Sequence, residues 1–167
     1  YTLRRMTSLG CPPERTVVLP MSVDTASMPF RERTIGPDGR IVIVTVARLV
    51  KKKGIDHSIR AFARAAAHHP GMIYRIIGEG PERGPLECLI GELGLAGRVE
   101  MPGALPVEEI RRIYDDSHIL LLASVTDESG FSEGQGVVLQ EAQACGLPVI
   151  ATAHESFREG VVEGESA

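Results

Sequence analysis

The sequence has no tryptophan, and aromatic residues make up only 4 % of its 167 residues. Its formal net charge is −4, so it lacks the basic excess that nucleic-acid-binding proteins usually carry. Few aromatic side chains also leave little material for stacking against bases. Apolar runs such as HILLLA at 118–123 are far shorter than the about 20 residues that span a bilayer. The composition therefore argues against a nucleic-acid-binding protein and against a membrane-spanning segment.

Cysteine is also scarce, since Cys11, Cys88 and Cys145 lie far apart and form no C-x-x-C pair. Isolated cysteines in odd number indicate free thiols and a reducing compartment, so we expect a cytoplasmic protein. The five histidines show no metal-ligand spacing, and no Asp-x-Asp motif occurs. We therefore expect no metal site.

From residue 41 onward, strand and helix patterns alternate regularly. Apolar, largely β-branched runs predict strands, and amphipathic segments between them predict helices. The strands are expected at 41–47, 72–78, 98–103, 118–124 and 147–152, and the helices at 55–68, 81–94, 107–117 and 136–146. This alternation predicts an α/β fold, a Rossmann-like doubly wound parallel sheet over 41–167. Residues 1–40 are rich in turns, hold one candidate strand at 15–20, and are expected to pack on that domain.

In such sheets ligands bind outside the carboxyl ends of the strands, so the loops there are the candidates for a site. The loop after the first strand carries Arg48 and Lys53, directly before Gly54 and the next helix. Two cations beside a helix N-terminus suit a phosphate or diphosphate. A solvated basic loop is the alternative at this point.

The loop after the second strand contains Gly78 and Gly80 and has some likeness to a dinucleotide-binding fingerprint. Arg83 occupies the third glycine position, and the motif does not open the first β-α unit. We therefore exclude a nicotinamide or flavin site. A tight turn of this kind can still expose its backbone edge to a flat base.

The strongest motif is EGQGVVLQE, in which Glu133 and Glu141 stand eight residues apart. Its glycines precede a predicted helix, where the backbone N–H groups at 136–138 are free to bind an anion. Glu141 shares a helix face with apolar residues, and a charge on such a face needs a partner. The alternative is that Glu133 is an acid near the helix start and Glu141 a surface residue.

Several segments together resemble retaining glycosyltransferases of family 4, and more narrowly the C-terminal, nucleotide-sugar-binding half of their two-domain GT-B fold. They are ARLVKKKGID, IIGEGPER, LLASVTDESGFSEGQGVVLQEAQACGLPVIAT, GVVEGES and VVLPMSVDTASM. The resemblance covers roughly residues 8–166. Within the family, EGQG and EAQACGLPV are most similar to enzymes of exopolysaccharide and colanic-acid-type assembly.

The resemblance implies roles for the residues already singled out. Arg48 and Lys53 match the cations that hold the donor diphosphate and stabilise the leaving group, and Glu133 matches the acid that binds the transferred sugar. The phosphate-binding, ribose-binding and base-flanking positions are matched by Gly136, Val137, Val138, Glu141, Gly78, Met101 and Gly103. The implied substrate is a UDP-sugar or GDP-sugar, without a cofactor or metal.

Two departures from the family pattern bear on function. After IAT the family usually has two glycines, whereas this chain reads AHESFREG, with Glu155 and Ser156 in their place. The acceptor-binding N-terminal domain of the fold is also absent, so we expect this chain alone to bind donor without transferring sugar. The acceptor of the full-length enzyme is expected to be a glycan or lipid-linked molecule at the inner face of the membrane. A stand-alone nucleotide-sugar-binding module, and an epimerase or phosphorylase of the same fold, remain the alternatives.

Overall fold

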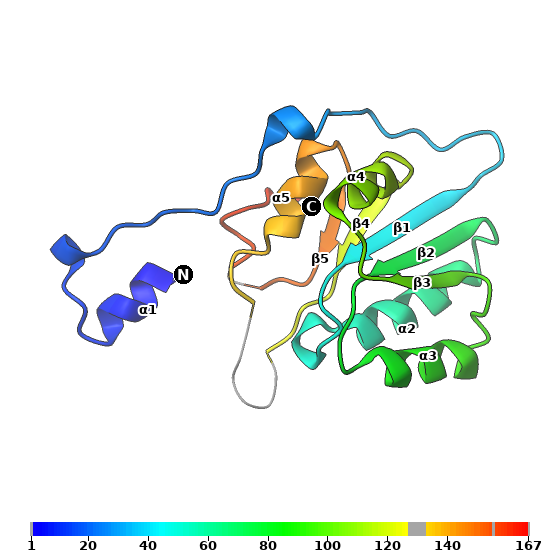
Figure 1. Cartoon of the computed structure of the whole chain (residues 1–167), viewed down its shortest axis with the longest axis horizontal. Helices are drawn as coiled ribbons and strands as arrows, with labels where there is room; N and C mark the ends of the chain where they lie inside the picture. Colours follow the sequence, from blue (N-terminus) through cyan, green and yellow to red (C-terminus); the bar gives the residue numbers. More distant parts are fainter. Residues whose placement is uncertain (1, 127–132, 155, 167) are drawn as a thin grey trace.

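A parallel sheet of five strands in the order β3-β2-β1-β4-β5 forms the centre of the structure (Figure 1). This is a computed structural model, and it describes residues 2–126, 133–154 and 156–166. The strands are β1 (Ile41–Val46), β2 (Met72–Ile77), β3 (Val99–Gly103), β4 (Ile119–Leu122) and β5 (Val149–Ala151). All neighbouring strands pair in parallel, which confirms the predicted α/β sheet.

The central strand β1 has the sequence IVIVTV, and its four inner residues are buried. It pairs with β2 in the register Ile41↔Met72 and with β4 in the register Ile43↔Ile119. A strand that has a neighbour on each edge and helices over each face buries all its side chains, so β-branched residues occupy both faces.

Two helices cover each face of the sheet, with α2 and α3 on one side and α4 and α5 on the other (Figure 1). The helices are α2 (Ile55–Ala66), α3 (Arg83–Glu92), α4 (Val107–Asp115) and α5 (Val137–Ala144). Each lies within the segment predicted from its amphipathic pattern, and the ends differ by at most two residues, as helix ends commonly do.

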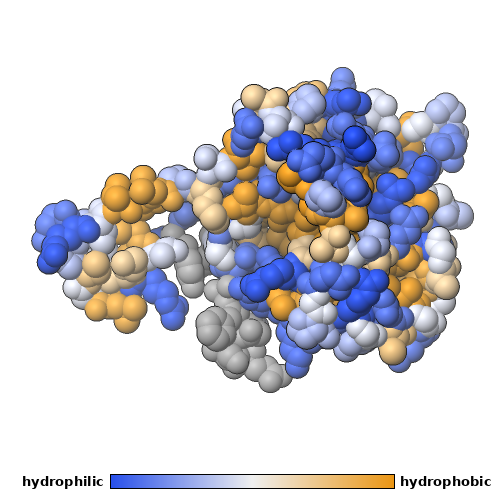
Figure 2. Space-filling view, in the orientation of Figure 1, coloured by the Kyte–Doolittle hydropathy of each residue, from blue (hydrophilic) through white to orange (hydrophobic). Residues whose placement is uncertain are grey.

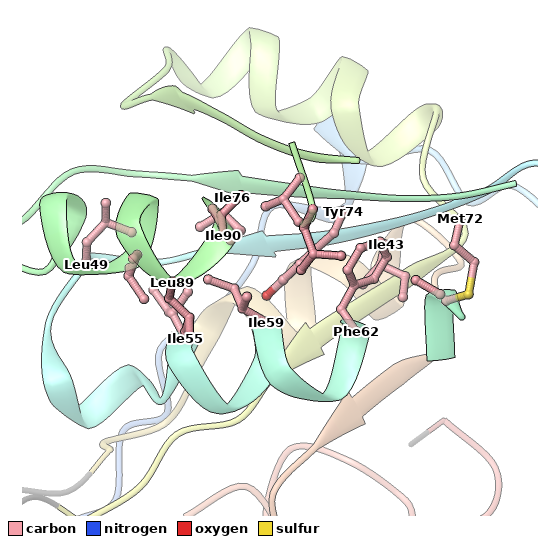
Figure 3. Packing of buried hydrophobic residues seen from close by; sticks show 14 residues of the cluster. Ile43, Leu49, Ile55, Ile59, Phe62, Met72, Tyr74, Ile76, Leu89 and Ile90 are labelled. Atoms are coloured by element: carbon pink, nitrogen blue, oxygen red, sulfur yellow. The ribbon is translucent and has the colours of Figure 1, made fainter. Parts of the chain in front are cut away.

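The core under α2 and α3 is a continuous apolar layer between these helices and strands β1 and β2 (Figure 3). Phe62 and Tyr74 meet there with ring centroids 5.4 Å apart. The Tyr74 hydroxyl lies 2.7 Å from the Thr45 hydroxyl, so its polar end has a partner inside the core. Full burial of a side chain of this size stabilises the fold by about 1.5–3 kcal/mol.

The core on the opposite face holds α4 and α5 against strands β4 and β5. Tyr114 from α4 and Leu139 from α5 are almost completely buried there. Phe157, from the segment after β5, closes the same cluster. The start of α5 therefore packs against both the sheet and the C-terminal segment that holds Phe157.

The N-terminal segment reaches away from the sheet (Figure 1). It contains the helix α1 (Thr2–Ser8) and the single 3-10 turns η1 (Pro13–Arg15) and η2 (Thr25–Ser27). The predicted strand at 15–20 is wrong, because this stretch pairs with no strand in the described structure, and Val17, Val18 and Leu19 are exposed. Figure 2 shows apolar side chains gathered on this segment, to the left of the main body.

Further along, two side chains attach this segment to the domain. The Gln135 side chain accepts a hydrogen bond from the Met21 N–H and donates one to the Met21 carbonyl, each at 2.7 Å. The Arg33 guanidinium donates to the carbonyl oxygens of Asp115, Ser117 and Cys145. Residues 21–33 are therefore held on the face of the sheet that carries α4 and α5.

None of the helices in the described part of the chain is both long and apolar enough to cross a membrane.

Candidate functional site at the carboxyl ends of the strands

The sheet reverses its order between β1 and β4. From β1 the chain proceeds through α2 to β2 on one side, whereas β4 and then β5 lie on the other side. In doubly wound sheets ligands bind at such a switch point, in the crevice outside the carboxyl ends of the strands. The motifs with Arg48 and Lys53 and with Glu133 lie in the loops that follow β1 and β4.

The loop after β1 is fixed against the end of β4. Its three lysines form a single 3-10 turn, η3 (Lys51–Lys53), which ends at Gly54 with φ 57°. A Cβ atom at Gly54 would lie 2.0 Å from the carbonyl oxygen of Ala123, so only glycine fits there. The Val125 N–H adds a hydrogen bond of 2.8 Å to the Lys52 carbonyl. The two loops thus form one rigid edge of the crevice.

At this edge Lys53 forms an ion pair with Glu133, which is 80 residues away in sequence. The side chains are only 13 % and 10 % exposed, so the pair is largely shielded from water. The Ser124 hydroxyl donates to the same carboxylate oxygen at 3.2 Å, and the Gly134 N–H donates to the other oxygen at 3.2 Å.

Burial by itself would raise the pKa of Glu133. The hydrogen bond and charge of Lys53 oppose that effect, together with the Gly134 N–H and the Ser124 hydroxyl, and the net result is a pKa below the ordinary glutamate value. Glu133 is therefore an ionised acceptor at neutral pH, and Lys53 is a cation held in place beside it.

Arg48 lies in the same loop but is exposed, and it makes no ion pair within the described residues. Its guanidinium is thus available to an anion that enters the crevice. The sequence predicts that Arg48 and Lys53, in one loop, both bind phosphate. The structure brings both to one loop, but it gives Lys53 a carboxylate partner.

The start of α5 forms the next part of the site. Its N-cap, Gly136, has φ 68°, and a Cβ atom there would lie 2.7 Å from the ring of Phe157. Within the described residues no side chain caps this start. The N–H groups of Val137 and Val138 belong to the first turn and have no acceptor in their own helix. This end follows Glu133 after three residues of sequence, and its free N–H groups favour an anion.

Glu141 lies one helical turn further along α5 and is half-buried. The hydroxyl of the buried Tyr114 donates to its Oε2 at 3.4 Å. Burial, followed by the charge of Glu141, raises the pKa of Tyr114, so the hydroxyl stays protonated and able to donate. Glu141 therefore has the partner that its position on an apolar face requires, and its second oxygen makes no hydrogen bond to any described residue.

On the far side of the crevice, the structure brings together the residues predicted to flank a base. The Gly78 N–H donates to the Gly103 carbonyl at 2.9 Å. Arg83 donates to the Met101 carbonyl at 2.9 Å and pairs with Glu79 at 2.7 Å. The loops after β2 and β3 therefore form a single wall beside the loop of Arg48.

The sequence did not identify two residues that complete the site. Ser124 is the second residue after the buried strand β4, and Thr152 follows β5 directly. The position of each at the carboxyl end of a strand is the signal that could have identified them. In the atypical AHESFREG stretch, Ser156 and Phe157 are buried. Glu155 of that stretch, and residues 127–132 of the loop after β4, lie outside the described residues. No cluster of three potential metal ligands occurs where side chains are described.

Comparison with known proteins identifies the family of the chain. Residues 29–167 match the family described as Glycosyl transferases group 1. WcaL of Salmonella typhimurium, named as a colanic acid biosynthesis glycosyltransferase, is 39 % identical over 163 residues, which are 97 % of this chain and 40 % of that protein. The chain thus spans about two fifths of that relative's length.

Two solved structures show the same fold. The C-terminal domain of the group 1 glycosyl transferase LpcC from Francisella tularensis superposes with a TM-score of 0.70 at 27 % identity, over 85 % of this chain and 76 % of that one. Anabaena HepE in complex with UDP superposes with a TM-score of 0.80 at 23 % identity, over 98 % of this chain and 45 % of that one. The chain belongs to the glycosyl transferases of group 1, and its fold is that of the family's C-terminal domain.

Proposed function

We propose that this chain is the donor-binding domain of a retaining glycosyltransferase and binds a UDP-sugar or a GDP-sugar in the crevice outside the carboxyl ends of β1 and β4. The observation that carries the proposal is the convergence of Lys53 and Glu133 at the switch point of the sheet, next to the uncapped start of α5. A cation and free N–H groups suit the diphosphate of a nucleotide sugar, and an anionic hydrogen-bond acceptor beside them suits the hydroxyls of its sugar.

In this proposal the diphosphate occupies the cationic side of the crevice. Arg48 and Lys53 neutralise its charge, and the N–H groups of Val137 and Val138 bind the distal phosphate. When the bond between the sugar C1 and the phosphate oxygen breaks, negative charge develops on the departing diphosphate. Fixed cations and helix N–H groups stabilise that charge without a bound metal.

The sugar and the nucleoside occupy the two ends of the crevice. Glu133 accepts hydrogen bonds from hydroxyls of the transferred hexose, and Glu141 accepts them from the ribose. Gly78 and the turn from Met101 to Gly103 flank the base. HepE, which shares this fold, binds UDP, and this supports a nucleoside diphosphate as the ligand.

The acceptor is proposed to bind to a further domain. Since the chain spans 40 % of WcaL, its matched segment corresponds to only part of that protein. We propose that residues 1–40 connect such a domain to the donor-binding domain at 41–167, and that the 167-residue chain alone does not transfer sugar. WcaL is named as a colanic acid biosynthesis glycosyltransferase, and this supports a glycan or lipid-linked acceptor in polysaccharide assembly. The free cysteines support a cytoplasmic enzyme, which would meet lipid-linked acceptors at the inner face of the membrane.

The test is calorimetric titration of the purified chain with UDP, GDP, UDP-glucose and GDP-mannose. We expect saturable binding of one nucleotide class, and a loss of about tenfold or more when Arg48 is replaced by alanine. Arg64→Ala removes an exposed arginine of α2 and is the matched control, with unchanged affinity expected. If none of the four ligands binds, or if Arg48→Ala binds as tightly as the unmodified chain, the proposal is wrong.

A further inference from the structure

Ser124 is the first polar side chain after β4, and it is 2 % exposed. Its hydroxyl donates to Oε2 of Glu133 at 3.2 Å. Oε2 is also the oxygen that pairs with Lys53, whereas Oε1 accepts from the Gly134 N–H. Among the described residues the carboxylate therefore has three donors, and of these only Ser124 belongs to the end of an interior strand of the sheet.

The backbone around Ser124 is fixed from both sides. On one side the Val125 N–H donates to the Lys52 carbonyl at 2.8 Å. On the other side the Thr152 hydroxyl donates to the Ser124 carbonyl at 2.6 Å, and the Thr152 N–H donates to the Leu122 carbonyl at 3.2 Å. The backbone at Ser124 is thus attached both to the loop after β1 and to the end of β5, and its side chain is buried.

The two side-chain donors to Glu133 differ in what a bound donor substrate does to them. Lys53 is a cation, and a diphosphate in the crevice competes for its ammonium group. Ser124 is neutral and buried, so a diphosphate does not attract it away from the carboxylate.

We propose that Ser124 is a positioning residue, which keeps the carboxylate of Glu133 directed at the sugar after Lys53 has turned to the diphosphate. This inference rests on the proposed function, because it assigns to Ser124 a part in donor recognition. It concerns the sugar end of the ligand alone, and it predicts no contact between Ser124 and the nucleotide.

The test uses Ser124→Ala and Ser124→Cys, which both remove the hydroxyl and differ in volume. The measured quantity is the ratio of the dissociation constants of the plain diphosphate and its nucleotide sugar, with UDP and UDP-glucose or with GDP and GDP-mannose. Both variants are expected to weaken the nucleotide sugar by about three- to tenfold and to leave the plain diphosphate unchanged. Ser117→Ala is the matched control, because Ser117 is 1 % exposed, precedes β4 and donates to the Ile113 carbonyl at 2.6 Å. It is expected to change neither constant.

The same substitution is then made in a Glu133→Ala background. If Ser124 acts through Glu133, removing its hydroxyl there has no further effect on the ratio. An equal loss with and without Glu133 would show that Ser124 contacts the sugar itself, and an equal loss for diphosphate and sugar would show a purely structural role. Either result overturns the inference, as does an unchanged ratio in both Ser124 variants.

These results are distinguishable from failure of the proposed function. If the unmodified chain binds none of the ligands, both the proposed function and this inference fail. If it binds them and Arg48→Ala abolishes binding while the Ser124 variants behave like the unmodified chain, only the inference about Ser124 fails.

Discussion

Replacing Glu133 by glutamine is expected to strengthen the binding of UDP or GDP. In the structure the ammonium of Lys53 is paired with the Glu133 carboxylate, and both side chains are largely shielded from water. A diphosphate must compete with that carboxylate for the same cation, and it is also repelled by the carboxylate's negative charge. Glutamine keeps the size of the side chain and removes the charge, so both effects are relieved.

The size of the effect follows from the geometry of the pair. A phosphate oxygen that contacts the Lys53 ammonium lies about 6 Å from the carboxylate that contacts the same group. With an effective dielectric constant of about 40, between the values for water and for a buried site, two unit charges at about 6 Å repel by about 1.4 kcal/mol. That energy corresponds to about tenfold in affinity. We therefore expect Glu133→Gln to bind the plain diphosphate about tenfold more tightly.

The assay is titration calorimetry at neutral pH with UDP and GDP. Asp115→Asn is the matched control, because it removes a carboxylate that is paired with Arg31 at 3.5 Å, on the segment just before β4 and so away from the crevice. It should leave both affinities unchanged. Weaker binding of the diphosphate by Glu133→Gln would contradict this prediction, since it would mean that the carboxylate positions Lys53 for the phosphate rather than competing with it.

Four further predictions follow from the same contacts. Glu141→Ala should weaken the diphosphate and its nucleotide sugar by similar factors, about ten- to a hundredfold in calorimetry, because it removes a charged acceptor from the nucleoside end; unequal losses would contradict the ribose assignment. The pKa of Glu133 is lowered in the folded state, so its ionised, paired form stabilises the protein at pH values above the unfolded-state pKa. This stabilisation is lost as the pH falls through the lower folded-state pKa. In urea titrations, the difference in unfolding free energy between the protein and Glu133→Gln should therefore change below about pH 4.3 and stay constant above about pH 6. Gly54→Ala should lower the free energy of unfolding in urea by about 2 kcal/mol or more, since the φ of Gly54 is 57° and a Cβ atom there would meet the Ala123 carbonyl oxygen. The control is Gly91→Ala, which has open space around it and should be neutral or stabilise by up to about 1 kcal/mol. EDTA should leave the affinity for diphosphate nearly unchanged, and a strict requirement for magnesium or manganese would show that the cation assignment is wrong.

The sheet and its helices could be predicted because their signals are local. The β-branched run of β1 and the amphipathic pattern of α2 each fix an element within about ten residues, and the alternation of such elements leaves few topologies. The candidate strand at 15–20 shows the limit of local signals. Its apolar residues suit a strand, but a strand needs a partner edge, and the described structure offers none to this segment.

The site could be predicted as a set of loops but not as a set of contacts. The carboxyl ends of the strands identify the loops of Lys53 and Glu133 as neighbours. Their ion pair depends on how the η3 turn packs against the end of β4, which requires the glycine at 54 and contacts between residues far apart in sequence. Ser124 has no motif of its own, and its role becomes visible only when the carboxylate beside it has been placed.

Donor binding at the carboxyl ends of the strands can be followed residue by residue in a titration of the amide signals of the chain by NMR, with UDP and with GDP. We expect that one of the two shifts the amides of Val137, Val138 and the loop from Arg48 to Gly54 in a saturable way, and that Arg48→Ala raises the ligand concentration needed for saturation by about tenfold or more. Saturable shifts confined to another part of the chain, with the start of α5 unaffected, would contradict this expectation.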